Sequence, residues 1–137
     1  MTQECTLIFE LEPPVPMTCA DGTGIEKGAI LEITDPFTVA LAAGDGDAVA
    51  GIAAEEKVAS DGKTKIGVYM RGIFRGTAGA TGATAGQGIM TYNGTGDDND
   101  IVVITAAEDN CMGTAFETAT NNETFIFYLN PTNRDIA

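Results

Sequence analysis

The fold is decided by the stretch from Ala50-Gly51-Ile52-Ala53-Ala54-Glu55 to Tyr69-Met70-Arg71-Gly72-Ile73-Phe74-Arg75. A run of small apolar residues leads into a polar turn at Ser60-Asp61-Gly62-Lys63-Thr64, and alternation of apolar and polar residues follows. Period-two alternation around an Asp-Gly turn predicts a β-hairpin whose second strand runs over residues 65–75. One face of that strand carries Ile66, Val68 and Met70. Because the stretch contains no catalytic motif, it favours a function carried by a surface.

The rest of the chain repeats this pattern of short apolar runs and turns. Further strands are predicted at 5–11, 28–33, 38–41, 49–55, 89–92, 100–105, 111–117 and 124–129. The Gly/Ala/Thr-rich run at 76–88 predicts a loop with one helical turn at most, because glycine costs about 1 kcal/mol at an interior helical position. We therefore expect an all-β fold, a small barrel or sandwich with at most one or two short helical turns.

The order of these segments occurs twice. The motif Gly-x-Ala-x-Glu stands at residues 51–55 and again at 113–117. A glycine-led strand precedes each copy, at 28–31 and at 86–89, and a polar turn with a long strand follows. Between them, Val39 and Leu41 match Val102 and Ile104. This order predicts two similar antiparallel units within one domain.

The N-terminal segment ends in the proline-rich run Glu12-Pro13-Pro14-Val15-Pro16. Proline favours extended chain and supplies no amide donor, so residues 1–16 are predicted to form an arm that leaves the body. A strand folded back on its own domain is an equally good interpretation. The domain itself is expected to span 17–131, with a tail at 132–137.

Composition excludes several classes of partner. The 137 residues include 20 acidic and seven basic side chains, giving a net charge of −13. Such a chain is repelled by phosphate groups, which argues against nucleic acid and anionic membranes. No apolar run approaches the roughly 20 residues needed to cross a bilayer, and Met1–Cys5 lacks the features of a signal peptide.

The residues that commonly carry chemistry are scarce. Cys5, Cys19 and Cys111 form no Cys-x-x-Cys pair, so free thiols are expected in a protein made in the cytoplasm. Histidine is absent, which removes the commonest general base and transition-metal ligand. Without such a base, nothing explains how Cys111 would be activated as a nucleophile.

Acidic groups supply the remaining candidates for a site. Asp45-Gly46-Asp47 and Asp97-Asp98-Asn99-Asp100 carry the oxygen ligands that calcium prefers, but neither matches the spacing of an EF-hand, and solvated turns explain both. Glu55, Glu56 and Glu117 supply carboxylates for a hydrolase, yet no tryptophan accompanies them. We therefore expect no catalytic residue, no cofactor and no metal.

Residues 28–75 resemble phage capsid decoration proteins of the lambda head-stabilising type. The matching features are Ala29-Ile30-Leu31, Thr38-Val39-Ala40-Leu41, the Asp-Gly-Asp-Ala turn at 45–48, and the strand that ends Arg71-Gly72-Ile73-Phe74-Arg75. Met112 to Glu117, followed by a strand into Leu129, resembles a related family of small phage head proteins. The lambda-type arm is longer and richer in Thr, Ser and Pro than residues 1–16.

The resemblance implies a structural virion protein, not an enzyme. It implies a homotrimer on the outer surface of the phage head, at three-fold positions, with an arm touching the major capsid protein and a stabilising effect against internal DNA pressure. Arginine and phenylalanine are enriched in interface cores, although a solvated strand end explains Arg71 and Arg75 equally well. The expected capsid or subunit contacts are Leu7, Ile8, Phe9, Pro13, Pro14, Arg71, Ile73, Phe74 and Arg75.

A carbohydrate- or cell-surface-binding β module on the virion is the alternative. Sugar-binding faces stack on aromatic rings, and the absence of tryptophan argues against it.

Overall fold

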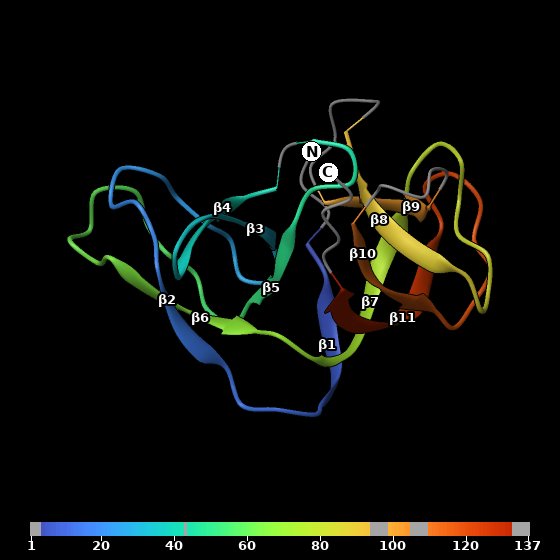
Figure 1. Cartoon of the computed structure of the whole chain (residues 1–137), viewed down its shortest axis with the longest axis horizontal. Coiled ribbons are helices and arrows are strands. Elements are labelled where there is room, and N and C mark those ends of the chain that lie inside the picture. Colours follow the sequence, from blue (N-terminus) through green and yellow to red (C-terminus); the bar gives the residue numbers. More distant parts are fainter. Residues whose placement is uncertain (1–3, 43, 94–98, 105–109, 133–137) are drawn as a thin grey trace.

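A computed structural model describes residues 4–42, 44–93, 99–104 and 110–132. The described residues form eleven strands and no helix, which confirms the all-β prediction (Figure 1). The strands are β1 (Thr6–Glu10), β2 (Val15–Thr18), β3 (Ile30–Asp35), β4 (Thr38–Leu41), β5 (Val49–Ala53), β6 (Lys65–Tyr69), β7 (Gly72–Ala78), β8 (Gly88–Tyr92), β9 (Asp100–Val103), β10 (Cys111–Ala115) and β11 (Thr124–Thr132). Among the residues that the structure describes, no helix is long and apolar enough to span a membrane.

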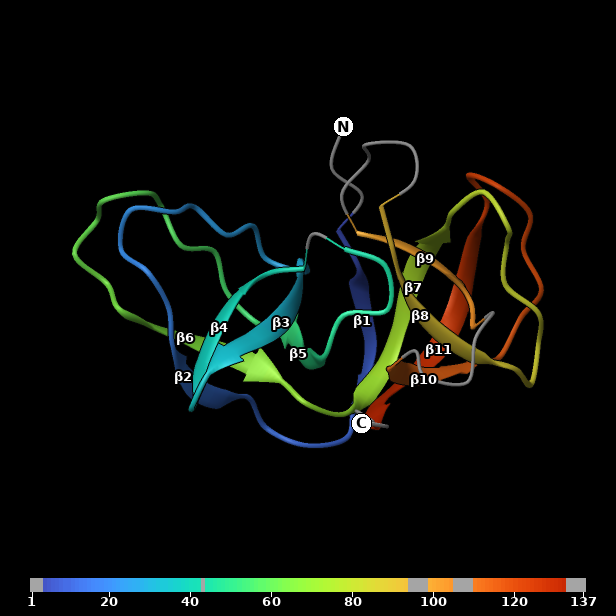
Figure 2. The same ribbon diagram turned by 45° about the horizontal axis from the view of Figure 1, so that its top comes forward.

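The strands are arranged in two five-stranded barrels that lie side by side (Figures 1 and 2). The first barrel closes in the order β2-β4-β3-β5-β6. In the second, the order β7-β11-β10-β8-β9 closes because β9 also pairs with β7. Strand β1 extends the second barrel by pairing antiparallel with the first half of β7.

The two barrels have the same topology, which confirms the internal repeat. In each, the closing contact is a parallel pair, Thr18 with Thr38 and Thr77 with Asp100, while all other neighbouring strands are antiparallel. The prediction was wrong by one residue in one strand. Since Thr38 corresponds to Asp100, Val39 corresponds to Ile101 and not to Val102.

The structure explains each fixed position of the repeated Gly-x-Ala-x-Glu motif. A Cβ on Gly51 would lie 2.0 Å from the carbonyl oxygen of Tyr69, and one on Gly113 would lie 1.9 Å from that of Tyr128. Only glycine allows the strands to approach this closely. The alanine is buried in both copies. The glutamate, Glu55 or Glu117, accepts a backbone hydrogen bond at 3.0 Å from the strand that follows.

The hairpin prediction is confirmed, because Ile52 and Ala53 of β5 pair with Tyr69 and Val68 of β6. The prediction of one continuous strand over residues 65–75 is wrong. The chain leaves the first barrel at Met70 and Arg71, and Gly72 begins β7 of the second barrel. Met70 and Arg71 are both exposed, because they belong to the connection between β6 and β7 and not to a strand of either barrel.

The N-terminal segment follows the alternative of a strand folded back on its own domain. Thr6 pairs with Arg75 and Glu10 with Gly72, so residues 6–10 belong to the sheet. Pro13 and Pro14 are exposed in the link to β2, and the predicted boundary at residue 16 falls inside that strand. The tail beyond Thr132 lies outside the described residues.

Two hydrophobic cores fill the barrels, and the second core also joins them. Ile30, Val49 and Ile52 point outward from the first barrel and pack with the core of the second. The Tyr69 ring meets the Phe74 ring across this junction, with centroids 5.9 Å apart. All three cysteines are free thiols. Burial, with a smaller effect from Glu4, raises the pKa of Cys5 to about 12.

Candidate interaction surface

An aromatic and apolar surface lies on the outer face of the second barrel. Side chains alternate along a strand, so the burial of Phe74, Phe125 and Phe127 in the core turns their neighbours outward. Strand pairing aligns Phe9 with Ile73, and Ile73 with Tyr128. We name this surface the Tyr128 face; it consists of Phe9, Arg71, Ile73, Arg75, Phe116, Ile126 and Tyr128.

Tyr128 is the centre of this face. Its ring stacks on the ring of Phe116 with centroids 6.3 Å apart and planes inclined by 20°. The Arg71 Nε donates a 3.0 Å hydrogen bond to the Tyr128 hydroxyl, and its guanidinium carbon lies 5.7 Å from the ring centroid. Phe116 is 53% exposed and Phe9 is 65% exposed. Solvent-facing aromatic side chains beside arginine are typical of a protein-binding surface.

The structure gathers four of the predicted contact residues on the Tyr128 face, namely Phe9, Arg71, Ile73 and Arg75. Leu7 points inward and packs against the second core, while Ile8 lies half-buried at the irregularity in β1. Phe74 is 1% exposed, so its side chain is unavailable to another chain and the prediction fails at this residue.

The sequence pattern did not indicate Phe116, Ile126 and Tyr128 as surface residues. In β11, Ile126 and Tyr128 stand among Phe125, Phe127 and Leu129, so the run from 125 to 129 is almost continuously apolar or aromatic. Hydrophobicity therefore did not indicate which face pointed outward. The pairing of Ile126 with Arg75 and of Tyr128 with Ile73 supplies the missing information.

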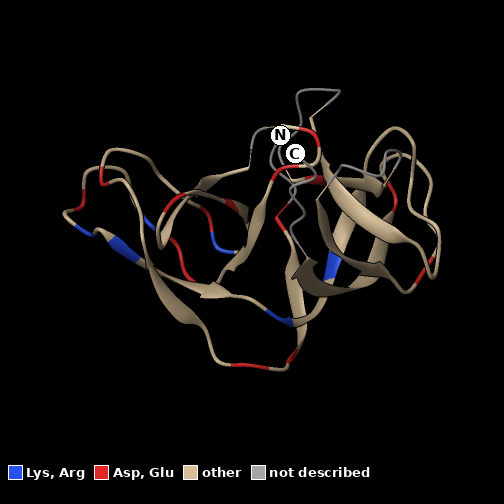
Figure 3. Cartoon of the chain, in the orientation of Figure 1, with Lys and Arg blue, Asp and Glu red and all other residues tan. Residues whose placement is uncertain are grey.

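Figure 3 shows how the few basic residues are distributed along an otherwise acidic chain. Four of the seven basic residues belong to the first barrel: Lys27, Lys57, Lys63 and Lys65. Arg71 and Arg75 lie on the Tyr128 face, within a chain whose net charge is −13. The face therefore holds two of the few arginines of an acidic protein, with Glu12 close to Arg71.

An open groove of about 330 Å³ adjoins the face at the junction of the barrels. Its lining includes Met17, Ile33, Met70 and Pro131, together with Glu12 and Arg71. Arg71 thus borders both the groove and the Tyr128 face.

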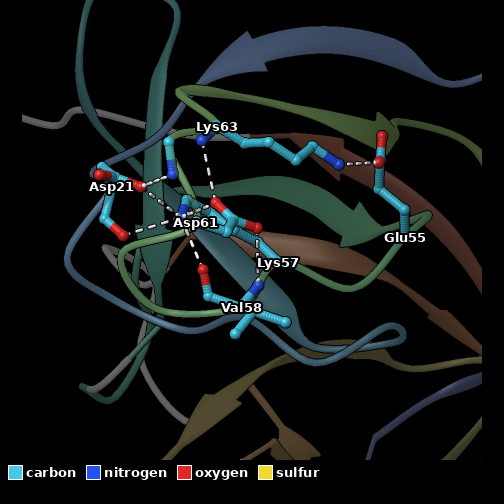
Figure 4. A network of polar contacts seen from close by, with 7 residues as sticks. Asp21, Glu55, Lys57, Val58, Asp61 and Lys63 are labelled. Carbon is cyan, nitrogen blue, oxygen red and sulfur yellow. Dashed lines mark hydrogen bonds and ion pairs between the residues drawn. The ribbon is translucent and has the colours of Figure 1, made fainter.

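A polar network that the sequence did not indicate joins the loop after β2 to the loop between β5 and β6 (Figure 4). The fully buried Lys57 ammonium donates to the Asp21 and Val58 carbonyl oxygens at 2.8 and 3.0 Å, and to the Asp61 carboxylate at 2.9 Å. Desolvation alone would lower the pKa of Lys57, but hydrogen bonds to Asp61 and Asp21 outweigh it and raise that pKa. The corresponding residue of the second barrel is Ala119. The Lys57 network therefore has a structural role, because it connects the loop that carries Asp21 to the loop that carries Asp61.

The acidic candidates act as local acceptors. Asp45 accepts the Asn93 amide at 2.8 Å, and Asp47 accepts the Gly44 amide at 2.7 Å. In the described part of the chain, no three His, Cys, Asp or Glu side chains are grouped to hold a metal ion, while Asp97 and Asp98 lie outside it.

The other candidates for chemistry lie apart. Glu55 and Glu117 belong to different barrels, and each binds a backbone amide of its own barrel. A hydrogen bond from Lys63, then one from the Gly67 amide, lowers the pKa of Glu55. Glu56 is exposed, and the half-buried Cys111 thiol lies 3.1 Å from the Gly113 carbonyl oxygen.

No protein-family model matches this sequence, and no curated protein matches it either. Among solved structures, the chain is similar to the N base of the head fibre gp8.5 of bacteriophage phi29. The TM-score is 0.57 at 14% sequence identity, and the match covers 88% of this chain and 96% of that one. The chain therefore shares its overall fold with the base of a phage head fibre.

Proposed function

We propose that this chain is a structural protein of a phage virion and attaches to the head. The observation that carries the proposal is the similarity to the phi29 head-fibre base, which extends over nearly the whole of both chains. The resemblance of residues 28–75 to capsid decoration proteins points to the same part of the virion. It rests on sequence motifs, whereas the similarity to the phi29 head-fibre base is one of fold. Under this proposal the chain has no catalytic activity and acts through its surfaces.

The finer form of the proposal is a decoration protein. The chain would sit on the outer surface of the capsid as a trimer at three-fold positions, bound to the major capsid protein. Each trimer would bury surface across neighbouring capsid subunits and raise the free energy needed to separate them. This form is supported by the sequence resemblance, whereas the structural similarity is to a head-fibre base.

The test uses the full chain and expanded, empty capsids that lack it. We expect saturable co-sedimentation with the capsids and a higher temperature of capsid disruption. Charge reversal at the Tyr128 face, as in Arg75→Glu, separates binding through this face from binding elsewhere. If the chain fails to co-sediment and the capsids are equally stable with and without it, the proposal is wrong.

A carbohydrate-binding module on the virion is the second candidate, and the exposed ring pair of Phe116 and Tyr128 favours it. Stacked, solvent-facing rings can bind the apolar face of a sugar. Glycan-array binding that is lost in Phe116→Ala and retained in Phe37→Ala would favour this function over a capsid contact. Phe37 is 69% exposed at a turn of the first barrel and serves as the matched control.

A further inference from the structure

Residues 44–47, which we name the 44–47 loop, precede β5 of the first barrel and reach across to the second barrel (Figure 2). The Gly46 amide donates a 3.0 Å hydrogen bond to the Thr91 carbonyl oxygen on β8, and the Asp47 amide donates to the Thr91 hydroxyl at 3.0 Å. That hydroxyl donates in turn to the Gly44 carbonyl oxygen at 2.9 Å. Thr91 is 3% exposed, so the centre of this contact is shielded from water.

Two more hydrogen bonds extend the contact on either side of Thr91. The backbone amide of Asn93, just after β8, donates to the Asp45 carboxylate at 2.8 Å. The side-chain amide of Asn110, just before β10, donates to the Gly46 carbonyl oxygen at 3.1 Å. Five hydrogen bonds between described residues thus hold the 44–47 loop on the second barrel. The loop is a connection between the barrels in addition to the shared core.

A pair of carboxyl groups lies at the base of the 44–47 loop. The half-buried side chain of Glu32, on β3, is hydrogen-bonded to the side chain of Asp47. Asp47 Oδ2 also accepts the Gly44 amide at 2.7 Å, which ties the carboxyl pair to the shape of the loop. Two ionised carboxylates are both acceptors, so the bond between Glu32 and Asp47 exists only while the pair holds a proton. When both groups are ionised, like charges at this distance repel each other.

From this geometry we propose that the 44–47 loop is a proton-dependent contact between the two barrels. The loop is held on β8 while Glu32 and Asp47 share a proton, and it leaves β8 when both carboxylates are ionised. The second core still joins the barrels, so the chain stays folded in both states. This regulation is a property of the chain itself and holds independently of the proposed attachment to a phage head.

The surroundings of Glu32 favour the shared proton up to neutral pH. Its neighbours across the strand pairs are Ala40 on β4 and Val49 on β5, and neither carries a charge. The residues of the second barrel that bind the loop are also uncharged. Among the described residues, Asp47 is the charged group that acts on Glu32: burial, then the hydrogen bond with Asp47 and its charge, raises the pKa of Glu32 to about 7. Because this pKa is raised, the contact is present at acid pH and is lost as the pH rises through 7.

The experiment measures amide hydrogen exchange in the full chain by nuclear magnetic resonance at pH 5 and pH 8. Each rate is divided by the intrinsic rate of an unstructured peptide at the same pH, which gives a protection factor. We expect the protection factors of the Gly46 and Asp47 amides to fall about 10-fold or more between the two pH values. The Ala53 amide, which donates to the Ala29 carbonyl oxygen at 2.9 Å within the first barrel, is the internal reference.

Three variants assign the effect to the carboxyl pair. Glu32→Gln keeps a hydrogen-bond donor toward Asp47 without a titrating proton, so the Gly46 and Asp47 amides should stay protected at both pH values. Asp47→Asn should remove the pH dependence at Gly46 in the same way, and it carries the test if Glu32→Gln fails to fold. Glu56→Gln, which neutralises an exposed glutamate of the first barrel, is the matched control and should behave like the wild type.

Circular dichroism of each variant at both pH values verifies folding. If the wild-type Gly46 and Asp47 amides change no more than the Ala53 amide between pH 5 and pH 8, the inference is wrong. It is also wrong if the folded Glu32→Gln and Asp47→Asn variants keep the wild-type pH dependence. Loss of that dependence in Glu56→Gln as well would assign it to overall charge and would equally overturn the inference.

Discussion

Replacing Gly113 by alanine tests whether the close approach of strands at the repeated motif is real. A Cβ at this position would lie 1.9 Å from the carbonyl oxygen of Tyr128 and 3.0 Å from its carbonyl carbon. These atoms are backbone, so no side-chain rotation relieves the overlap. Strands β10 and β11 must separate to accommodate the methyl group.

The cost follows from that separation. The oxygen must move by about 1.5 Å, from 1.9 Å to the 3.4 Å of an ordinary contact. Overpacking of this kind costs about 1–3 kcal/mol. A shift of this size also breaks roughly two backbone hydrogen bonds, at about 1 kcal/mol each. We therefore expect Gly113→Ala to lower the free energy of unfolding by about 3–5 kcal/mol, which corresponds to a loss of roughly 10 °C or more in Tm.

Urea denaturation followed by far-ultraviolet circular dichroism measures this loss, with two comparison variants. Gly51→Ala should behave like Gly113→Ala, since its Cβ would lie 2.0 Å from the Tyr69 oxygen. Gly22→Ala is the control, because nothing lies within 4 Å of its Cβ. If Gly113→Ala proves as stable as Gly22→Ala, the strands are not held at this distance and the explanation of the motif is wrong.

Two further predictions concern a half-buried carboxyl group and the junction of the barrels. Burial, then a hydrogen bond with Asp47, raises the pKa of Glu32 to about 7 from an ordinary value of 4.5. A carboxyl group with a raised pKa binds its proton more tightly in the folded state, so its contribution to stability is present below pH 4.5 and is lost as the pH rises through 7. Glu32→Gln should therefore be more stable than the wild type in urea at pH 8 and gain little at pH 4; an equal difference at both pH values would contradict the assignment. Phe74 is 1% exposed, and its ring lies 5.9 Å from that of Tyr69 and 6.1 Å from that of Phe127, so Phe74→Ala should cost about 3–5 kcal/mol in the same assay. Phe37→Ala, at an exposed turn, should stay within about 0.5 kcal/mol, and a similarly small loss in Phe74→Ala would refute its place in the core.

The local sequence pattern was enough to predict structure at positions where the backbone geometry restricts the residue type. The Asp-Gly turn and the alternation around it predicted the β5–β6 hairpin, and the Gly-x-Ala-x-Glu motif predicted the repeat. No comparable sequence signal marks Met70 and Arg71 as the point where the chain crosses from the first barrel to the second. The buried positions of β6 and β7 are even-numbered on both sides of the crossing, and Met70 is apolar, so the sequence alternates unbroken although Met70 is exposed.

Contacts between residues far apart in the sequence could not be predicted from the local pattern. The pairing of β1 with β7 joins residues more than 60 positions apart, and proline content alone allowed either an arm or a strand. In the sequence, Lys57 is indistinguishable from a surface lysine. Its burial depends on the loop that carries Asp21, which is distant in the sequence. The Tyr128 face combines residues from three strands, from the crossing between β6 and β7, and from the segment after β10.

Comparison of equivalent positions shows what the repeat constrains. Ile66 and Val68 fill the first barrel where Phe125 and Phe127 fill the second, and the pairing to the neighbouring strands still matches. Side chains have diverged inside the barrels, whereas the glycine and the glutamate that set strand contacts recur. A fold defined by so few backbone-determined residues is compatible with low sequence identity, such as the 14% shared with the phi29 head-fibre base. Positions that differ between the barrels but face outward are therefore where function is best sought. Phe116 meets that criterion, because its counterpart in the first barrel is Ala54 and its ring is 53% exposed beside Tyr128.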